Sequence, residues 1–240
     1  MKGVEMIKSN LLLKPRLQAV FDLLKPCGIL CDIGTDHAYI PIAALQQAIA
    51  GRAIACDIHM PPLRAAEKNI RTNSLADHIE CRQGAGFTPL NEDEIGQVVI
   101  AGMGGLTIRM ILSEGIGKAK KAVRLVMQPN NHISEVRQWL GDHGFTIEEE
   151  VVVQEKELYY QAFAAVYTGQ TEALSNLELN YGRLNLQRYD AVVLSLLQHD
   201  ATIMRKALAG MQQAHRDVGE QTKAVELQLQ AIRQILRESI

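Results

Sequence analysis

The stretch Leu30-Cys31-Asp32-Ile33-Gly34-Thr35-Asp36-His37 decides the fold of this chain. It is an apolar run that ends in a single glycine, and the next apolar run ends in Asp57. A buried strand, a glycine turn, a helix and a second strand ending in a carboxylate are typical of the first half of a doubly wound sheet. The sequence therefore predicts an α/β fold that binds a nucleoside cofactor at the carboxyl ends of its strands.

The turn itself argues against a dinucleotide. Dinucleotide sites use G-x-G-x-x-G, because the pyrophosphate approaches the backbone along the whole turn. Here Gly34 stands alone, and Asp36 lies where the phosphate would be and would repel it. A ribose suits Asp57, and an ammonium group suits the acids near the turn. S-adenosyl-L-methionine carries both groups and is the cofactor that the pattern favours.

Composition narrows the class of protein further. The 240 residues, 47% of them hydrophobic, are enough for one α/β core plus an appendage. Since no apolar run reaches the roughly 18–20 residues that span a bilayer and no charged leader opens the chain, we expect a cytoplasmic protein without a membrane partner. The cysteines and histidines lack metal-binding spacing, so we expect no metal. A net charge of −2 counts mildly against a nucleic-acid binder, although a local basic patch would suffice.

Strands and helices are expected to alternate through the first half of the chain. A helix from Asn10 to Leu24 comes first. The predicted strands are 29–33, 53–57, 79–82, 97–101 and 123–128, and the predicted helices between them are 40–50, 61–69, 107–113 and 133–140. Two further strands, 145–153 and 159–167, read as a hairpin. Alternation predicts a parallel sheet, and the hairpin predicts an antiparallel edge.

The sequence changes character near residues 168–170, which predicts two domains, 1–168 and 169–240. Beyond that point strand signals are scarce, and apolar residues recur at spacings of three and four. They form two stripes: Val193, Leu197, Ala201, Met204, Leu208, Met211, and then Val218, Val225, Leu229, Ile232, Leu236. This pattern predicts an antiparallel coiled-coil hairpin; one long helix that dimerises is the alternative.

Several acids are candidates for binding the cofactor. Asp57 ends a strand, where a carboxylate can accept hydrogen bonds from two ribose hydroxyls, and Ile58 can then pack on adenine. The alternative for Asp57 is a capping acid before Pro61. Asp32 lies inside an apolar strand, where an acid is costly unless it is paired. It could receive the ammonium group through water or only support the turn.

Two loops supply the remaining contacts on this side. Asp36 and His37 follow the turn and either touch the cofactor or cap the next helix. The loop Gly84-Ala85-Gly86 follows the third strand, where many such sites have an acid for the adenine amino group. Ala85 leaves only backbone and packing there. We assign cofactor binding to Asp32, Gly34, Thr35, Asp36, His37, Asp57, Ile58, Ala85, Gly86, Gly102 and Met103.

Cofactor and substrate are expected to meet at the ends of the fourth and fifth strands. The run Gly102-Met103-Gly104-Gly105 would let a flat base approach the backbone; a tight turn before a helix is the alternative. The run Gln128-Pro129-Asn130 offers amide donors and acceptors for a base edge. Its alternative is a strand stopped by proline, with Asn130 or Asn131 capping the next helix.

Together these motifs resemble the bacterial tRNA adenine-N1 methyltransferase family of the TrmK type. The resemblance rests on C-D-I-G-T-D-H-A-Y-I-P at residues 31–41, I-A-G-M-G-G at 100–105 and L-V-M-Q-P-N at 125–130. It covers most of the chain, and it departs at Ala85, usually polar or acidic, and at Arg183, often proline. It implies a class I S-adenosyl-L-methionine-dependent methyltransferase fold, Rossmann-like, with a helical C-terminal domain. It also implies methylation of adenine 22 in the D-arm of tRNA.

A mechanism follows that needs neither a strong base nor a metal, because N1 of adenine carries its own lone pair. The enzyme must expose the base and align N1 with the methyl group. The catalytic candidates are Gln128 and Asn130, which would hold the base edge, and Gly104, which would give close approach. The substrate-binding candidates are Lys14, Arg16, Pro129, Arg183, Arg188, Arg205 and Lys206.

Other interpretations of the sequence remain open. Eight basic and eight acidic residues balance between 171 and 240, so the tail either grips tRNA phosphates or is a solvated coiled-coil surface. The chain could instead methylate a small molecule or a protein, or be a binding module that keeps a cofactor pocket without catalysis. The oligomeric state is open, with a monomer favoured.

Overall fold

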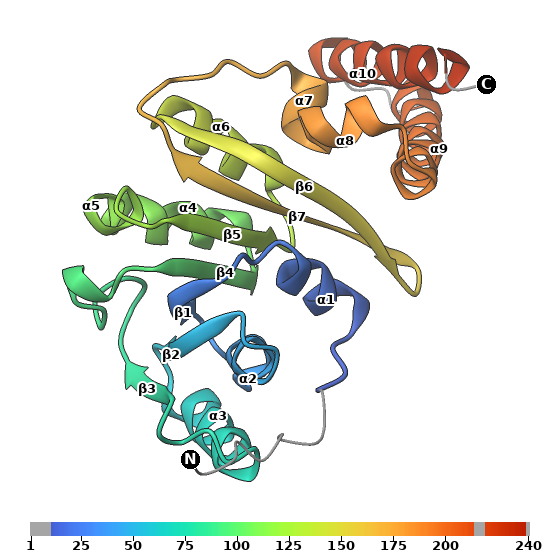
Figure 1. Cartoon of the computed structure of the whole chain (residues 1–240). Coiled ribbons are helices and arrows are strands. Elements are labelled where there is room, and N and C mark those ends of the chain that lie inside the picture. The colour runs from blue at the N-terminus through green and yellow to red at the C-terminus, as the bar shows by residue number, and fades with distance from the viewer. Residues whose placement is uncertain (1–10, 214–218, 239–240) are drawn as a thin grey trace. The chain divides into compact units, whose positions relative to one another are not determined.

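The computed structural model of the chain describes residues 11–213 and 219–238 (Figure 1). It divides into two compact units, one that reaches to Glu172 and one that begins at Ala173. The predicted boundary at residue 168 falls directly after the last strand of the first unit, which ends at Tyr167. Each unit has its own core and is described separately.

A seven-stranded sheet in the order β3-β2-β1-β4-β5-β7-β6 forms the centre of the first unit (Figure 1). The first five strands are parallel, and β7 runs antiparallel to both β5 and β6. This confirms the predicted class I methyltransferase sheet with its antiparallel edge hairpin. The strands are β1 Cys27–Ile33, β2 Ala50–Asp57, β3 Ile79–Gln83, β4 Gln97–Met103, β5 Arg124–Pro129, β6 Phe145–Glu155 and β7 Leu158–Tyr167.

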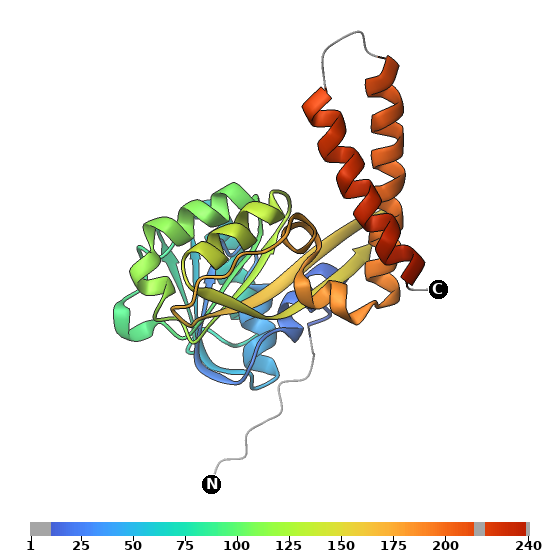
Figure 2. The same cartoon turned by 90° about the horizontal axis from the view of Figure 1, so that it is seen from above.

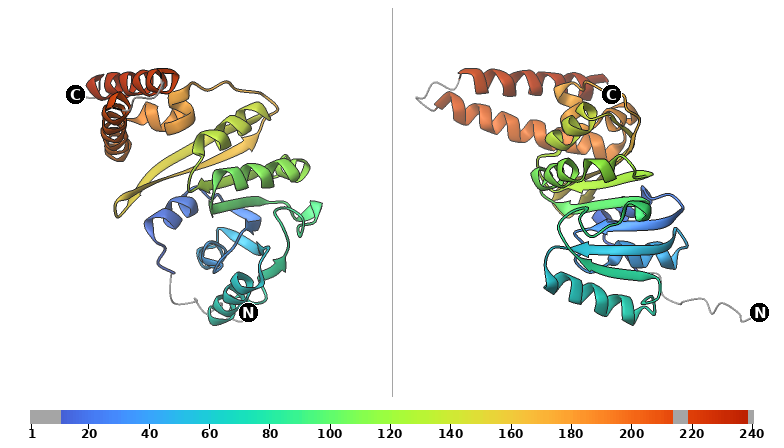
Figure 3. Two further views of the ribbon diagram at one scale, coloured as in Figure 1. Left: turned by 180° about the vertical axis from the view of Figure 1, so that it is seen from behind. Right: turned by 90° about the vertical axis from the view of Figure 1, so that its left-hand side faces the viewer.

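Helices cover both faces of this sheet (Figure 3). One buried cluster includes apolar side chains of α1, α2 and α3, and a second includes those of α4, α5 and α6. Sheets covered on both faces have continuous apolar strands, which is why β1 and β5 were readable from the sequence. The helices are α1 Pro15–Asp22, α2 Tyr39–Gln46, α3 Met60–Thr72, α4 Gly105–Glu114, α5 Ile116–Ala119 and α6 Ile133–Asp142, with the 3-10 turn η1 Glu92–Glu94.

The order of the strands positions the site. The strand β1 lies between β2 and β4, so the chain turns to one side of β1 and later to the other. Ligands of open α/β sheets bind at such a switch point, outside the carboxyl ends of the strands. Asp32, at the end of β1, pairs with Ala55 of β2 and with Val99 of β4, which places it at this point.

The first helix begins later than the sequence predicted. Asn10, its predicted cap, lies outside the described residues, and residues 11–14 are not helical. The helix α1 starts at Pro15, with Lys14 in an extended conformation before it. Proline favours the first turn of a helix and disfavours a helical residue in front of it, so it fixes this start. The three leucines before it had suggested an amphipathic helix.

The second unit contains four described helices rather than the two predicted. The long helices α9 Ala191–Gln213 and α10 Gly219–Glu238 lie side by side (Figure 2). Val193, Leu197 and Ala201 are buried on one, and Leu229 and Ile232 on the other, as the stripes predicted. Val218, in the predicted second stripe, lies outside the described residues. Whether the pair has coiled-coil geometry stays a prediction.

Two short helices, α7 Asn176–Tyr181 and α8 Arg183–Arg188, precede the long pair and were not predicted. Ser175 and Glu178 form a capping box at the start of α7, and this S-x-x-E spacing was a visible signal. The hydroxyl of the buried Tyr181 donates to Asp200 over 3.0 Å and so ties α7 to α9. Among the described residues, no helix is both long enough and apolar enough to cross a bilayer.

Candidate functional site

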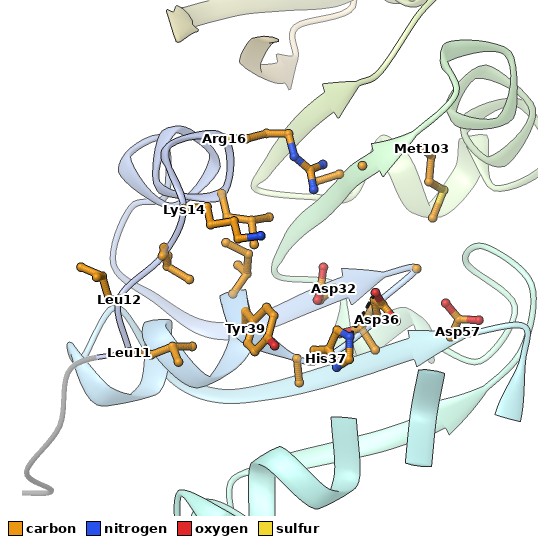
Figure 4. Close-up of a pocket in the computed structure, with 18 residues that line it drawn as sticks. Leu11, Leu12, Lys14, Arg16, Asp32, Asp36, His37, Tyr39, Asp57 and Met103 are labelled. Carbon is orange, nitrogen blue, oxygen red and sulfur yellow. Dashed lines mark ion pairs between the residues drawn. The ribbon is translucent and has the colours of Figure 1, made fainter. Parts of the chain in front are cut away.

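A cavity of about 680 Å³ lies at the carboxyl ends of β1, β2 and β4 (Figure 4). Residues 11–14, 16–17, 32, 34–40, 57 and 101–103 line it. Eight of the predicted cofactor residues are therefore brought together: Asp32, Gly34, Thr35, Asp36, His37, Asp57, Gly102 and Met103. The cavity also includes Lys14 and Arg16, which the sequence had suggested for the substrate.

The glycine turn after β1 is tied to the neighbouring strand. The backbone N–H groups of Gly34 and Thr35 both donate to the carbonyl of Cys56, over 2.7 and 2.8 Å. Gly34 has φ +80°, a conformation that glycine adopts readily and that other residues adopt at a cost. The turn therefore needs a glycine for its backbone alone, and it is held in place by β2.

Asp32 is a buried acid beside this turn. It is 7% exposed, and burial raises its pKa to about 6. The Thr35 hydroxyl lies close enough to lower that pKa, although among the described residues it has no hydrogen bond of normal geometry. The charge of Asp57 raises the pKa further. A buried carboxyl group that faces a cavity is a natural partner for a cationic ligand group.

Asp57 makes a local turn contact and also lines the cavity, but it does not cap α3, whose first flanking residue is His59. Its Oδ1 accepts the backbone N–H of His59 over 2.7 Å, which is a local turn contact just before α3. The side chain also lines the cavity. One carboxylate oxygen thus fixes the side chain, and Oδ2 remains the atom for a ribose hydroxyl. That ribose role stays a prediction.

Asp36 and His37 do not cap the following helix. The residue before α2 is Ala38, in the left-handed region with φ 56°, and no side chain caps that helix. His37 instead stacks on Tyr39, with ring centroids 5.1 Å apart, and its Nε2 lies 3.4 Å from Oδ2 of Asp36. Tyr39 is a lining residue that the sequence reading missed; its signal was an aromatic residue two positions after His37.

The loops expected to hold adenine lie beside Asp57 but do not line the cavity. Ile58 is 55% exposed. Asp57 pairs with Gln83, and the N–H of Gly84 donates to the Asp57 carbonyl, so the loop with Ala85 and Gly86 starts next to the acid. Gly86 has φ +51°. Adenine contacts by Ile58, Ala85 and Gly86 stay predictions.

Hydrogen bonds join Arg16 to the end of β5. Arg16 Nη1 donates to Gln128 Oε1 over 2.8 Å, and Gln128 Nε2 donates to the Pro129 carbonyl and to Asn130 Oδ1 over 2.9 and 3.2 Å. Asn130 Nδ2 donates to the Gly102 carbonyl over 2.6 Å. Gln128 is 0% exposed and its amide is fully used, whereas Asn130 is exposed. The buried Gln128 therefore bonds to Asn130 and exposes no atom to a base. The sequence had suggested instead that Gln128 holds a base directly.

The glycines after β4 are used for packing between two loops. A Cβ on Gly105 would lie 2.3 Å from the His132 carbonyl oxygen, and one on Gly104 would lie 3.2 Å from Oδ1 of Asn131. The N–H of Gly105 donates to both the carbonyl and the side chain of Asn131. Asn131 thus caps α4 rather than α6, which begins after His132 without a side-chain cap. Close approach of a base to Gly104 stays a prediction.

The substrate candidates fall into different environments. Pro129 is buried, so it cannot touch a substrate through its side chain in this state. In the second unit, Arg183 donates to Glu178 and Arg188 to Asn185, each over 2.6 Å. Arg205 and Lys206 are exposed on α9. Arg188 is exposed as well.

No cluster of three or more His, Cys, Asp or Glu side chains in the described part of the chain could hold a metal ion. The four cysteines are free thiols. Burial raises the pKa of Cys31 and Cys81 to about 11 and that of Cys56 to about 12. These thiols are protonated at neutral pH and are poor nucleophiles.

The arrangement matches a known family of enzymes. Residues 13–163 match a family described as a methyltransferase domain. The tRNA (adenine(22)-N(1))-methyltransferase of Bacillus subtilis (strain 168) is 34% identical over 176 residues, which are 73% of this chain and 74% of that protein. The chain belongs to the TrmK family of tRNA adenine-N1 methyltransferases. The resemblance seen in the motifs is therefore confirmed.

Solved TrmK-like structures extend the similarity to the helical tail. The Streptococcus pneumoniae protein Sp1610, in complex with S-adenosyl-L-methionine, is 30% identical, with a TM-score of 0.83 over 94% of this chain and 100% of that one. TrmK of M. capricolum, in complex with S-adenosyl-homocysteine, is 26% identical, with a TM-score of 0.80 over 94% and 98%. The similarity to both TrmK-like proteins therefore includes the second unit.

Proposed function

We propose that this chain transfers a methyl group from S-adenosyl-L-methionine to N1 of adenine 22 in the D-arm of tRNA. The observation that carries the proposal is the cavity at the switch point of the sheet, lined by acids for the cofactor and by Gly102, to which the exposed Asn130 donates, in a chain of the TrmK family. A methyltransferase for small molecules or proteins, or a module without catalysis, has no comparable support.

The acids on the β1 and β2 side fit the cofactor. The buried carboxyl of Asp32 matches its ammonium group, and the Oδ2 atom of Asp57 matches its ribose. Gly34 leaves the backbone of the turn open to a ligand. When bound, the cofactor supplies a methyl group on a cationic sulfur. The aromatic pair of His37 and Tyr39 lines the same cavity and offers a flat surface to the cofactor or to a base.

The loops after β4 and β5, next to the lining residue Gly102, fit a nucleobase. N1 of adenine is largely unprotonated at neutral pH, so the protein need not remove a proton before transfer. Its tasks are to hold the base and to align N1 with the methyl group. The exposed amide of Asn130 is the group that holds the base edge, and Gly104 gives room for it. A base reaches these loops only when it is taken out of its stack.

The positive charges suit the tRNA backbone. Lys14 lines the cavity in the first unit, whereas the guanidinium of Arg16, another lining residue, is bonded to Gln128. In the second unit, Arg205 and Arg233 line a hollow of about 430 Å³ between α9 and α10, together with Glu226. We assign this hollow to a phosphate group, with Lys206 beside it. The remaining parts of the proposal are a monomer in the cytoplasm, where tRNA is available, and a division of the chain into two domains, 1–168 and 169–240.

The test is transfer of labelled methyl from S-adenosyl-L-methionine to an unmodified tRNA transcript, followed by identification of the nucleoside and its position. We expect N1-methyladenosine at position 22 and none in a transcript with uridine there. The variant Asp57→Ala should bind the cofactor more weakly. Methylation of another nucleoside, or no methylation with cofactor binding intact, would point to another substrate. If the unaltered protein does not bind S-adenosyl-L-methionine, the interpretation as a module without catalysis would remain.

A further inference from the structure

The hydrogen bonds that begin at Arg16 can run in one direction only. A guanidinium group has five N–H donors and no acceptor. Its contact with Gln128, over 2.8 Å, therefore requires the amide oxygen of Gln128 to face Arg16. Because Gln128 is 0% exposed, water is not at hand to stabilise the opposite orientation. Arg16 thus favours, on the oxygen side, the same orientation of the buried amide that the Pro129 carbonyl favours on the nitrogen side.

The orientation of the Gln128 amide also fixes the orientation of the Asn130 amide. Gln128 uses its two amide hydrogens on the Pro129 carbonyl and on Asn130 Oδ1. Asn130 then turns its NH2 group to the Gly102 carbonyl, 2.6 Å away. A reversed Asn130 would set NH2 against NH2 and oxygen against oxygen. These two repulsive contacts make the observed orientation the stable one.

Arg16 is itself held by several neighbours. Its guanidinium carbon lies 5.6 Å from the ring centroid of Tyr160, and its backbone N–H donates to Glu155 Oε2 over 3.2 Å. A Cβ on Gly102 would lie 2.9 Å from Arg16 Nη1. The glycine therefore leaves the room that the guanidinium occupies. A guanidinium bonded to Gln128 and lying over Tyr160, on a backbone that is tied to Glu155, is suited to positioning another group.

After these internal bonds, Asn130 keeps one amide hydrogen and one oxygen lone pair, and it is exposed. The N6 and N7 edge of adenine presents one donor and one acceptor, and asparagine pairs with that edge in nucleic-acid recognition. Guanine presents two acceptors at the same edge, so it matches poorly. Binding by N6 and N7 also leaves N1 of adenine free to meet the methyl group.

We infer that Arg16, acting through Gln128, is a positioning residue that orients the Asn130 amide, and that Asn130 reads the N6 and N7 edge of the target adenine. The inference rests on the proposed function and adds the basis of its specificity for the base. It predicts a dependence on N7, an atom that takes no part in methyl transfer.

The test uses a tRNA transcript with 7-deazaadenosine at position 22, which lacks N7 but keeps N1 and N6. We expect kcat/KM of the unaltered enzyme to be roughly tenfold lower on this tRNA, the effect of one hydrogen bond. Asn130→Ala should methylate both transcripts slowly and equally. Arg16→Met should lower kcat on normal tRNA and lose most of the N7 dependence, with little change in the KM for tRNA or in cofactor affinity.

Two further variants separate positioning from a general structural role. Gln128→Glu still accepts from Arg16 but has no hydrogen for Asn130, so it should behave like Arg16→Met. Arg71→Met removes an exposed arginine from α3 and should behave like the unaltered enzyme on both transcripts. Thermal unfolding checks that each variant is folded, and if Arg16→Met is not, Gln128→Glu decides.

The outcomes are distinct. If the unaltered enzyme methylates both transcripts equally well, Asn130 does not read N7, although the proposed function stands. If Arg16→Met and Gln128→Glu are folded and keep the full N7 dependence, Arg16 does not position Asn130. If the unaltered enzyme makes no N1-methyladenosine in normal tRNA, the proposed function itself is wrong.

Discussion

The methyl end of Met103 lies directly against the turn at Gly34. A Cβ on Gly34 would be 1.7 Å from Cε of Met103, far inside van der Waals contact. The two residues come from β4 and from the turn after β1, on neighbouring strands. Met103 therefore covers the turn where a cofactor is expected. Its flexible thioether can adjust to a ligand there.

This contact predicts the behaviour of Gly34→Ala. The positive φ at this position should cost about 1–2 kcal/mol of folding free energy, and the clash with Met103 adds to it. In Gly34→Ala/Met103→Ala the clash is gone and only the backbone strain remains, so part of the stability should return. Urea unfolding measures both. Gly28→Ala, where a Cβ would meet open space, is the matched control. Equal stabilities of the single and double variants would show that Met103 is not an obstacle.

Asp32 predicts a pH dependence. Burial raises its pKa to about 6 from 3.8, so the folded protein holds the proton more tightly than the unfolded chain. The buried acid therefore lowers the free energy of unfolding little below pH 4. The loss of stability grows as the pH rises to 6, up to about 3 kcal/mol. Asp32→Asn should raise the free energy of unfolding at pH 8 and change it little at pH 4. An equal gain at both values would contradict the raised pKa.

The same shift affects the cofactor. Because a protonated Asp32 offers no charge to an ammonium group, the affinity for S-adenosyl-L-methionine should fall as the pH drops below about 6. Calorimetric titration at pH 5 and 8 measures this. Asp32→Asn should bind weakly at both values, with no such pH dependence.

A buried ion pair links α6 to the edge hairpin. Arg137 and Glu150 are 0% and 2% exposed, with 3.4 Å between Nε and Oε1, and Arg137 Nη2 also donates to Gln161. Burial lowers the pKa of Arg137, and the charge of Glu150 opposes that shift. Glu150→Ala removes one carboxylate partner from a buried cation and should cost up to about 3–5 kcal/mol in urea unfolding. Glu157→Ala, in the exposed turn of the hairpin, should cost little.

The hollow in the second unit predicts a dependence on salt. Arg205→Ala/Arg233→Ala should raise the KM for tRNA and reduce its salt dependence by about one unit of log–log slope for each lost phosphate contact. Cofactor affinity should not change. Arg237→Ala, an exposed cation outside the hollow, is the control. An unchanged KM for tRNA in the double variant would show that this surface of the tail does not bind tRNA.

The parts that the sequence predicted well are those with local causes. Continuous apolar strands, the glycine turn and Asp57 follow from short-range patterns, and together they placed the cavity at the correct edge of the sheet. The start of α1 was predicted too early because residues 11–13 are all leucine. Leu12 is in fact 96% exposed, on a segment without secondary structure in front of Pro15.

Other features depended on distant partners and could not be read from the chain. Gln128 looked like a base-binding residue because its neighbours Pro129 and Asn130 end a strand. Its partner Arg16 is 112 residues away, and only the fold shows that the amide is buried and used. The capping role of Asn131 likewise depends on a distant partner, because the N–H group that it accepts belongs to Gly105 at the start of α4, 26 residues earlier.

The wall formed by residues 11–17 has a consequence for how this protein is made. The helix α1 packs on β5, β6 and β7, whose last residue is Tyr167. A growing chain leaves the ribosome from its N-terminus, so α1 emerges long before the strands that hold it. The acids of β1 and β2 can assemble early, and α1 can already contact α2, but most of the surface on which α1 packs forms only after the hairpin has been synthesised. A truncated nascent chain would therefore have half a binding site and no means of orienting Asn130.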